Sequence, residues 1–185
     1  MLDKLLNNDF GVRINTDEIV NERFNNDWQS QNAQIAAARI AVKLRKDCLD
    51  RGESFNQETT LVGNTIITNI KRAKDLGFKI NLFYVGLESV ELSIKRVEIR
   101  RHAGGHGIPK EDLQRRYTNS FENLELVLPL CDSVQIYDNS GSKTFDILIP
   151  LLVVQDGQII KWDNNCPKYI QSILMKYAMW LNGQR

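Results

Sequence analysis

Short apolar segments alternate along the chain with longer segments in which apolar residues recur every three or four positions. This alternation predicts an α/β fold with a mainly parallel sheet. Strands are expected over residues 10–15, 54–58, 79–86 and 133–137, with 79–86 (KINLFYVG) the most buried. Helices are expected from Ser30 to a stop at Gly52, and over 64–76, 89–102 and 109–127.

The pattern changes after residue 143. Apolar segments over 147–154 and 158–162 flank Asp156-Gly157, a dipeptide that favours a tight β-hairpin. A final amphipathic helix is expected over 167–181. Its apolar positions are Ile170, Ile173, Leu174, Tyr177 and Leu181. We therefore expect a main domain over residues 1–143, with a C-terminal hairpin and helix over 144–185 packed on it.

Composition and charge limit the cellular compartment and the classes of binding partner. The 185 residues carry a net charge of +1, too little to attract nucleic acid or an acidic membrane by an overall field. The three cysteines, Cys48, Cys131 and Cys166, are far apart and odd in number, which favours a reducing compartment. No segment has the apolar length of a signal peptide or a membrane span. A soluble cytoplasmic protein is expected, with no nucleic-acid or membrane partner.

The segment 95–117 (KRVEIRRHAGGHGIPKEDLQRRY) places arginines on two helices joined by a glycine-rich turn. Most of its basic residues, Arg115 among them, have an acidic residue three or four positions away. Arg96 and Arg100 have none, and they lie four positions apart on one helix face. Guanidinium groups that converge in this way commonly bind phosphate. The sequence therefore predicts that residues 89–127 form a lid that closes over a polyphosphate.

Two acidic positions follow predicted strands. Asp17 would face the crevice at the carboxyl end of the first strand, where it could act as a general base or hold a metal-bound water. As an alternative, Thr16 and Asp17 could cap the following helix. Glu58, Thr59 and Thr60 close the second strand and could bind a sugar or nucleoside and help to coordinate magnesium. In the alternative interpretation, the two threonines cap a helix and Glu58 is solvated.

Two further motifs are less specific. Residues 138–141 (DNSG) have turn chemistry, and a contact with a nucleotide base is the functional alternative. His102 and His106 flank the glycine turn, but a metal would need two more ligands and none falls at a suitable spacing. No metal site built from these histidines is expected.

In order along the chain, the motifs DEI, ETTL, RxxxR, GGHxxP, RRY and DNS resemble the zeta-toxin family of P-loop kinases, particularly its chromosomal branch. The resemblance runs over about residues 11–140. The matching lid positions are Arg96, Arg100, Gly104, Gly105, His106, Pro109, Arg115, Arg116, Tyr117, Ser120 and Asn123. It implies a P-loop kinase-like three-layer fold that transfers phosphate from ATP, with Mg²⁺, to a hydroxyl of a small molecule. The toxins proper act on UDP-N-acetylglucosamine, and an antitoxin-like protein is an implied partner.

The resemblance also implies roles for single residues. Asp17 would be the base that positions the acceptor hydroxyl, and the acceptor would contact Glu58, Thr59 and Thr60. Arg96 and Arg100 would neutralise charge on the transferred phosphoryl group. The closed lid would add Arg115, Arg116 and His106.

One element of the family is absent from the sequence. No GxxxxGK[ST] motif precedes Asp17, and the segment 141–144 (GSKT) lacks the upstream glycine and follows the wrong strand. Residues 1–9 resemble the end of the helix that follows a P-loop, so we expect an upstream segment to be missing. The sheet then lacks its first central strand, and the strands 54–58 and 79–86 are expected either to leave a gap or to close up.

Two functions of different classes follow. In the first, the chain is a zeta-toxin-like kinase, inactive in this form because it lacks the P-loop. In the second, it is a non-catalytic remnant that binds a nucleotide, a nucleotide sugar or a protein partner through the arginine lid. An RNA-binding module is a weaker third reading, because Tyr117 is the only aromatic residue interleaved with the arginines.

Overall fold

The computed structural model describes residues 10–27, 30–102, 107–141 and 148–184. The chain forms two compact units, one ending at Thr59 and the other beginning at Thr60. Each unit contains helices and strands, which confirms the α/β class. In the described part of the chain, no helix combines the length and the apolar character needed to cross a bilayer.

The first unit is a parallel strand pair with a helical crossover. It contains β1 (Val12–Ile14), α2 (Thr16–Arg23), α3 (Gln31–Arg51) and β2 (Phe55–Gln57). The strands pair in parallel, so their carboxyl ends lie at the same edge. Alanines on α3 pack with apolar residues of β1 and α2, and the buried cluster consists of Ile14, Ile19, Val20, Ala37 and Ala41. This cluster packs β1 against α2 and α3.

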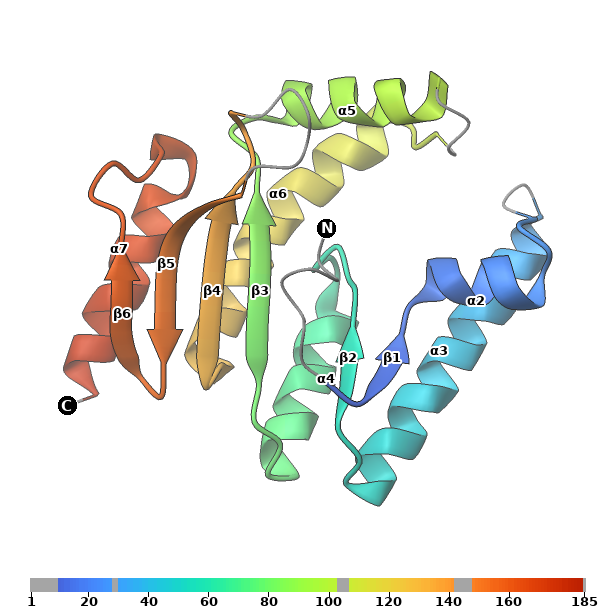
Figure 1. Cartoon of the computed structure of the whole chain (residues 1–185), viewed down its shortest axis with the longest axis horizontal. Helices are drawn as coiled ribbons and strands as arrows, with labels where there is room; N and C mark the ends of the chain where they lie inside the picture. Colours follow the sequence, from blue (N-terminus) through green and yellow to red (C-terminus); the bar gives the residue numbers. More distant parts are fainter. Residues whose placement is uncertain (1–9, 28–29, 103–106, 142–147, 185) are drawn as a thin grey trace. The chain divides into compact units, whose positions relative to one another are not determined.

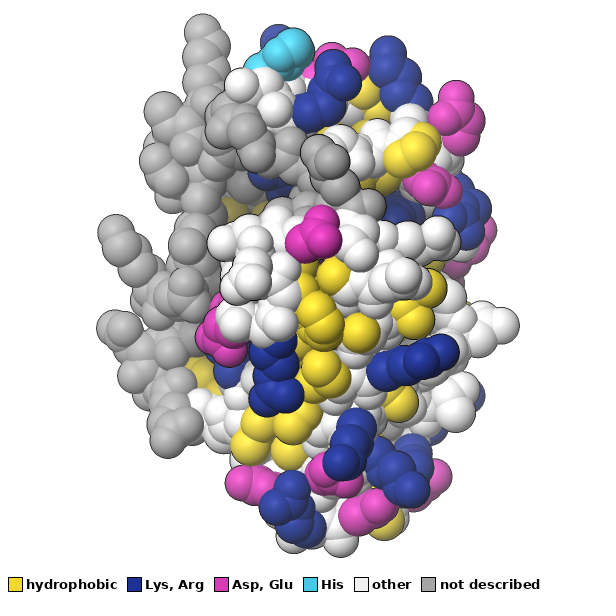
Figure 2. Space-filling view, turned by 90° about the vertical axis from the view of Figure 1, so that its right-hand side faces the viewer, with side chains coloured by type: hydrophobic (Ala, Val, Ile, Leu, Met, Phe, Trp, Pro, Cys, Tyr) yellow, Lys and Arg dark blue, Asp and Glu magenta, His cyan; other side chains and the backbone are white. Residues whose placement is uncertain are grey.

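The ends of α3 follow the predicted signals. The Ser30 hydroxyl accepts a 3.2 Å hydrogen bond from the amide of Ala33, and Gly52 ends the helix in the left-handed conformation at φ 65°. Not all apolar residues of α3 are buried, since Ile35 and Val42 are 44% and 55% exposed. Figure 2 shows a face of the chain on which apolar side chains lie among lysine and arginine side chains.

The second unit contains a four-stranded sheet in the order β3-β4-β5-β6 (Figure 1). Its strands are β3 (Asn81–Gly86), β4 (Ser133–Asp138), β5 (Ile149–Gln155) and β6 (Gln158–Trp162). Its helices are α4 (Asn64–Asp75), α5 (Val90–His102), α6 (Lys110–Val127), the 3₁₀ turn η1 (Leu128–Leu130) and α7 (Lys168–Gly183). Helices α6 and α7 lie behind the sheet in Figure 1 and share one apolar core with it.

The C-terminal predictions are confirmed. The turn between β5 and β6 has Asp156 at φ 47° and Gly157 at φ 73°, the backbone conformation that a two-residue hairpin turn requires. All five apolar positions expected on one side of α7 are buried. The hairpin and the C-terminal helix predicted from the hydrophobic pattern are therefore both present.

Two expectations about the strands are corrected. The sheets are mixed rather than mainly parallel, because β5 pairs antiparallel with β4 and β6 with β5, whereas β1–β2 and β3–β4 are parallel. The hairpin thus extends the sheet. Strand β3 is mostly half-buried, with only Gly86 fully buried, because it lies at the edge of its sheet in the described part of the chain. Strands β2 and β3 belong to separate sheets.

Candidate functional site

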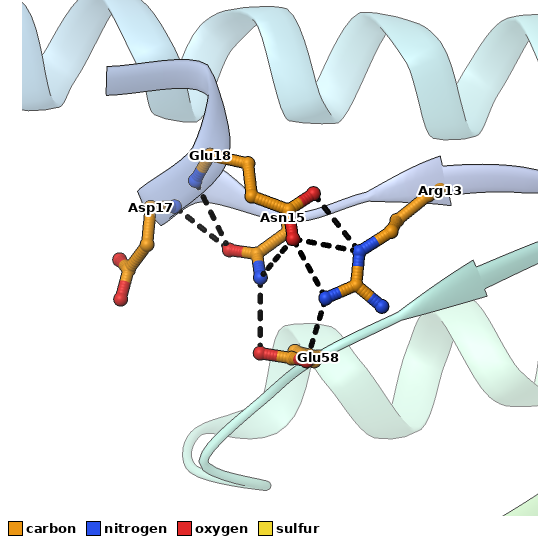
Figure 3. A network of polar contacts seen from close by, with 5 residues as sticks. All are labelled: Arg13, Asn15, Asp17, Glu18 and Glu58. Atoms are coloured by element: carbon orange, nitrogen blue, oxygen red, sulfur yellow. Dashed lines mark hydrogen bonds and ion pairs between the residues drawn. The ribbon is translucent and has the colours of Figure 1, made fainter. Parts of the chain in front are cut away.

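Polar side chains converge where β1 and β2 end (Figure 3). Asn15 follows β1 in extended conformation and caps α2, because its Oδ1 accepts hydrogen bonds from the amides of Asp17 (2.9 Å) and Glu18 (3.4 Å). The interpretation of Thr16 or Asp17 as the cap is therefore wrong. The chain turns into the helix one residue earlier, and an asparagine is already present there to satisfy the free amides.

Arg13 joins two carboxylates from different elements. Its Nε donates to both oxygens of Glu18 at 2.7 and 2.9 Å, and its Nη2 lies 2.7 Å from Oε1 of Glu18. The same Nη2 donates to Oε1 of Glu58 at 3.1 Å. Arg13 and Glu18 were not singled out from the sequence. The helical pairing rule applies to residues three or four positions apart within one helix. Arg13 lies in a strand, five positions before Glu18, so the rule does not predict this pair.

Glu58 is held at both oxygens. Arg13 donates to Oε1, and Nδ2 of Asn15 donates to Oε2 at 3.0 Å. The alternative in which Glu58 is simply solvated is therefore wrong, although its side chain is 44% exposed. The Glu58 carboxylate therefore lies just beyond the carboxyl end of β2. Two donors fix its direction: Arg13 in β1, and Asn15, which directly follows β1.

Asp17 differs from its neighbours. Its side chain is exposed and points away from the network in Figure 3. Among the described residues, neither a hydrogen bond nor an ion pair reaches its carboxylate. The described part of the chain also contains no group of three His, Cys, Asp or Glu side chains placed to hold a metal ion. Asp17 is thus free to contact a ligand from solvent.

Thr59 and Thr60 are exposed at the surface. The residue at the cap position of α4 is Gly63, and no side chain bonds to the free amides there. The interpretation of the two threonines as helix caps is therefore wrong. The turn before α4 is held instead by Asn123, which donates to the carbonyl oxygens of Leu61 (2.9 Å) and Gly63 (3.2 Å).

A second cluster lies where β3 and β4 end. Asp138 is 6% exposed, and its Oδ1 accepts bonds from the amide of Ser140 (3.1 Å), the hydroxyl of Ser140 (2.5 Å) and the hydroxyl of Tyr169 (2.7 Å). The bond from the Ser140 amide confirms the predicted turn. The contact with Tyr169 was not predicted, because the two residues are 31 positions apart.

Gly86 makes room for this cluster. A Cβ atom built on Gly86 would lie 2.7 Å from the hydroxyl of Tyr169, closer than a methyl group can approach. The ring of Tyr169 also packs edge-to-face on Phe121, at 5.8 Å between centroids. Phe121 makes similar contacts with Tyr117 (5.0 Å) and Tyr84 (6.1 Å). An aromatic cluster therefore joins α6 to β3 and α7.

The expected lid helices are anchored near the sheet. Nη2 of Arg96 donates to the carbonyl oxygen of Asn139, and the hydroxyl of Tyr117 donates to the carbonyl oxygen of Leu87 at 2.9 Å. These bonds hold α5 to the end of β4 and α6 to the end of β3. The side-chain Oδ1 of Asn139 is buried and has no hydrogen-bond partner among the described residues.

The remaining arginines differ in environment. Arg100 is exposed and Arg116 is partly exposed. Arg115 pairs with Asp112 at 2.7 Å, which confirms one of the pairings expected from helical spacing. His106, Gly104 and Gly105 lie outside the described residues. Arg96 and Arg100 therefore differ in exposure, although the sequence pattern treats them alike.

An apolar cleft lies between the C-terminal half of α5 and the N-terminal end of α6. Its lining includes Ile94, Val97, Ile108 and Leu113, with charged residues Glu98, Arg101 and Lys110 also contributing. Lys110 pairs with Glu98 across the two helices at 3.6 Å. Neither Arg96 nor Arg100 lines this cleft, so it is separate from the expected phosphate contacts.

Comparison with known proteins gives one relative at moderate identity. An uncharacterized protein of Haemophilus influenzae is 38% identical over 85 residues, which cover 46% of this chain and 61% of that protein. The chain thus spans less than two thirds of the relative it matches. No family model matches the chain, and no solved structure matches it.

Proposed function

We propose that this chain carries the acceptor-binding and lid parts of a zeta-toxin-like phosphotransferase with a P-loop kinase-like fold. The observation that carries the proposal is the arrangement at the end of the first parallel strand pair. There Asp17 presents a carboxylate free of partners among the described residues, while Glu58 on the neighbouring strand is fixed in place. A free carboxylate beside an oriented one suits the handling of a substrate hydroxyl at a strand end.

In this proposal Asp17 accepts the proton of the acceptor hydroxyl as it attacks the transferred phosphoryl group. The acceptor is a small molecule that carries hydroxyl groups, such as a nucleotide sugar, and it contacts Glu58, Thr59 and Thr60. The exposed position of these residues leaves them accessible.

The lid arginines would meet the phosphate groups. Arg100 is exposed, and Arg96 is half-buried and donates to the carbonyl oxygen of Asn139, which places its guanidinium beside the end of β4. ATP and Mg²⁺ would normally also be held by a P-loop, and the printed sequence contains no such motif. We therefore propose that the 185-residue chain binds ligands without turning over ATP.

The second candidate is a non-catalytic protein that binds a nucleotide, a nucleotide sugar or a protein partner through the arginine lid. This candidate requires only ligand binding by the 185 residues, in which no GxxxxGK[ST] motif occurs. ATP turnover separates the two candidates. The first predicts transfer to an acceptor once a strand and P-loop are supplied ahead of residue 10, and the second predicts none.

The test compares the 185-residue chain with such an extended version, using ATP, Mg²⁺ and UDP-N-acetylglucosamine. We expect transfer only in the extended version and its loss in Asp17→Asn. Nucleotide binding should weaken more in Arg96→Ala and Arg100→Ala than in the matched variants Arg101→Ala and Arg115→Ala. Transfer that survives Asp17→Asn, or equal effects of the four arginine variants, would contradict the assigned roles.

A further inference from the structure

Arg13 is held more firmly by Glu18 than by Glu58. Three contacts of 2.7 to 2.9 Å join its guanidinium to Glu18, whereas a single 3.1 Å bond joins it to Glu58. Charge-assisted contacts of this kind are strongly directional. Glu18 therefore dominates the orientation of the guanidinium, and Nη2, which contacts Glu18, also reaches Glu58.

Among the described residues, Glu58 receives one donor on each oxygen, from Arg13 and from Asn15. A carboxylate has about four lone-pair directions, so each oxygen keeps capacity for one further donor. Because its side chain is 44% exposed, that capacity faces an accessible surface. The geometry suits two neighbouring hydroxyl groups, which can each donate to one oxygen.

The charge around Glu58 limits what can bind. Among the described contacts, two carboxylates, Glu18 and Glu58, share one positive group, Arg13, so this set carries one surplus negative charge. An anionic group placed here would be repelled, while a neutral hydroxyl pair would not. The cluster therefore discriminates between the uncharged and the phosphate-bearing end of a ligand.

We propose that Arg13, oriented by Glu18, is a positioning residue that presents Glu58 to a pair of hydroxyl groups on the uncharged sugar or polyol end of the acceptor. This inference rests on the proposed function, since it assumes that an acceptor binds beyond β1 and β2. In this inference, Arg13 and Glu18 help to select the acceptor and take no part in the chemical step.

The test is calorimetric titration of the full chain with UDP-N-acetylglucosamine and, separately, with UDP, which lacks the sugar. Arg13→Gln and Glu58→Gln should each weaken binding of the sugar nucleotide about tenfold and leave UDP binding unchanged. The double variant should lose no more than either single variant. Arg13→Lys, which keeps the charge without the planar fork, should not restore affinity.

A ligand-free measurement accompanies the titration. The side-chain amide of Asn15 donates to Glu58, so its NMR resonance should move in Arg13→Lys while the urea midpoint stays close to that of the unsubstituted chain. Equal loss of UDP and UDP-sugar binding, or additive losses in the double variant, would overturn the positioning role alone. Failure of the unsubstituted chain to bind either ligand would overturn the proposed function, and the hydroxyl-pair assignment with it.

Discussion

The hydroxyl of Tyr169 donates a 2.7 Å hydrogen bond to Oδ1 of Asp138, a carboxylate that is 6% exposed. Burial raises the pKa of Tyr169 strongly, and the hydrogen bond to Asp138 raises it further, so the phenol remains a donor across the ordinary pH range. This bond ties the first turn of α7 to the end of β4. The hydroxyl of Tyr169 should therefore contribute measurably to the stability of the second unit.

Tyr169→Phe is expected to destabilise the chain by about 1–3 kcal/mol, because it removes a donor from a buried carboxylate and leaves the ring in place. Urea unfolding followed by circular dichroism measures the change. Tyr177→Phe is the matched control. Tyr177 is also on α7 and 4% exposed, but its buried hydroxyl has no hydrogen-bond partner in the part of the chain that the structure describes. Its loss should be neutral or stabilising, and a cost equal to that of Tyr169→Phe would contradict the argument.

Gly86→Ala should destabilise the chain through the same contact. The added Cβ would lie 2.7 Å from the hydroxyl of Tyr169 and 3.1 Å from the nearest ring carbon, so the ring must move away from Asp138. In a Tyr169→Phe background, the closest clash and the hydrogen bond are both absent. The alanine should therefore cost less there, and additive free energies of unfolding in the double variant would show that the two sites are independent.

Asp132 should make part of the stability dependent on pH. Burial alone would raise its pKa, but Nζ of Lys74 (2.7 Å) and the amide of Ile80 (2.8 Å) donate to the carboxylate, and its pKa lies below the usual range. A lowered pKa stabilises the fold above the ordinary carboxyl pKa of about 4, and this contribution is lost as pH falls through the lowered value.

Asp132→Asn keeps an acceptor for Ile80 and removes the charge. Its deficit in unfolding free energy should be greatest near neutral pH and should shrink below about pH 4. Urea titrations between neutral and acidic pH measure this difference. A deficit that stays constant with pH would mean that the carboxylate charge contributes nothing.

Two substitutions of Asn15 separate helix capping from the support of Glu58. Asn15→Ala removes both, and it should cost about 1 kcal/mol through the lost cap. Asn15→Asp keeps a good capping oxygen but replaces the donor to Glu58 with a carboxylate. The aspartate variant should therefore be the more stable of the two in urea, while both should weaken binding of a hydroxyl-bearing ligand. The reverse order of stability would contradict the capping assignment.

Local signals in the sequence predicted the elements well. Ser30 and Gly52 mark the ends of α3, and Asp156-Gly157 sets the hairpin, because each acts within a few residues. The capping residue of α2 was missed. Asn15, Thr16 and Asp17 all have capping side chains, and only the path of the chain out of β1 selects among them.

The hydrophobic and charge patterns of the sequence did not predict most side-chain contacts of the candidate sites. Glu58 meets Arg13 across 45 positions because the register of β1 on β2 places them together. One partner of Arg96 is a backbone carbonyl, which charge patterns along a helix do not reveal. The sequence did place Asp17 and Glu58 at the strand ends, since parallel strands align their carboxyl edges.

The long crossover between β1 and β2 has a kinetic consequence. Only three residue pairs join these strands, and they can form only after some forty intervening residues, including α2 and α3, have been brought into place. Contacts that close so long a loop tend to form late in folding. The ion pair between Arg13 and Glu58 should therefore report the last step in assembly of the first unit, appearing when its helices have already packed.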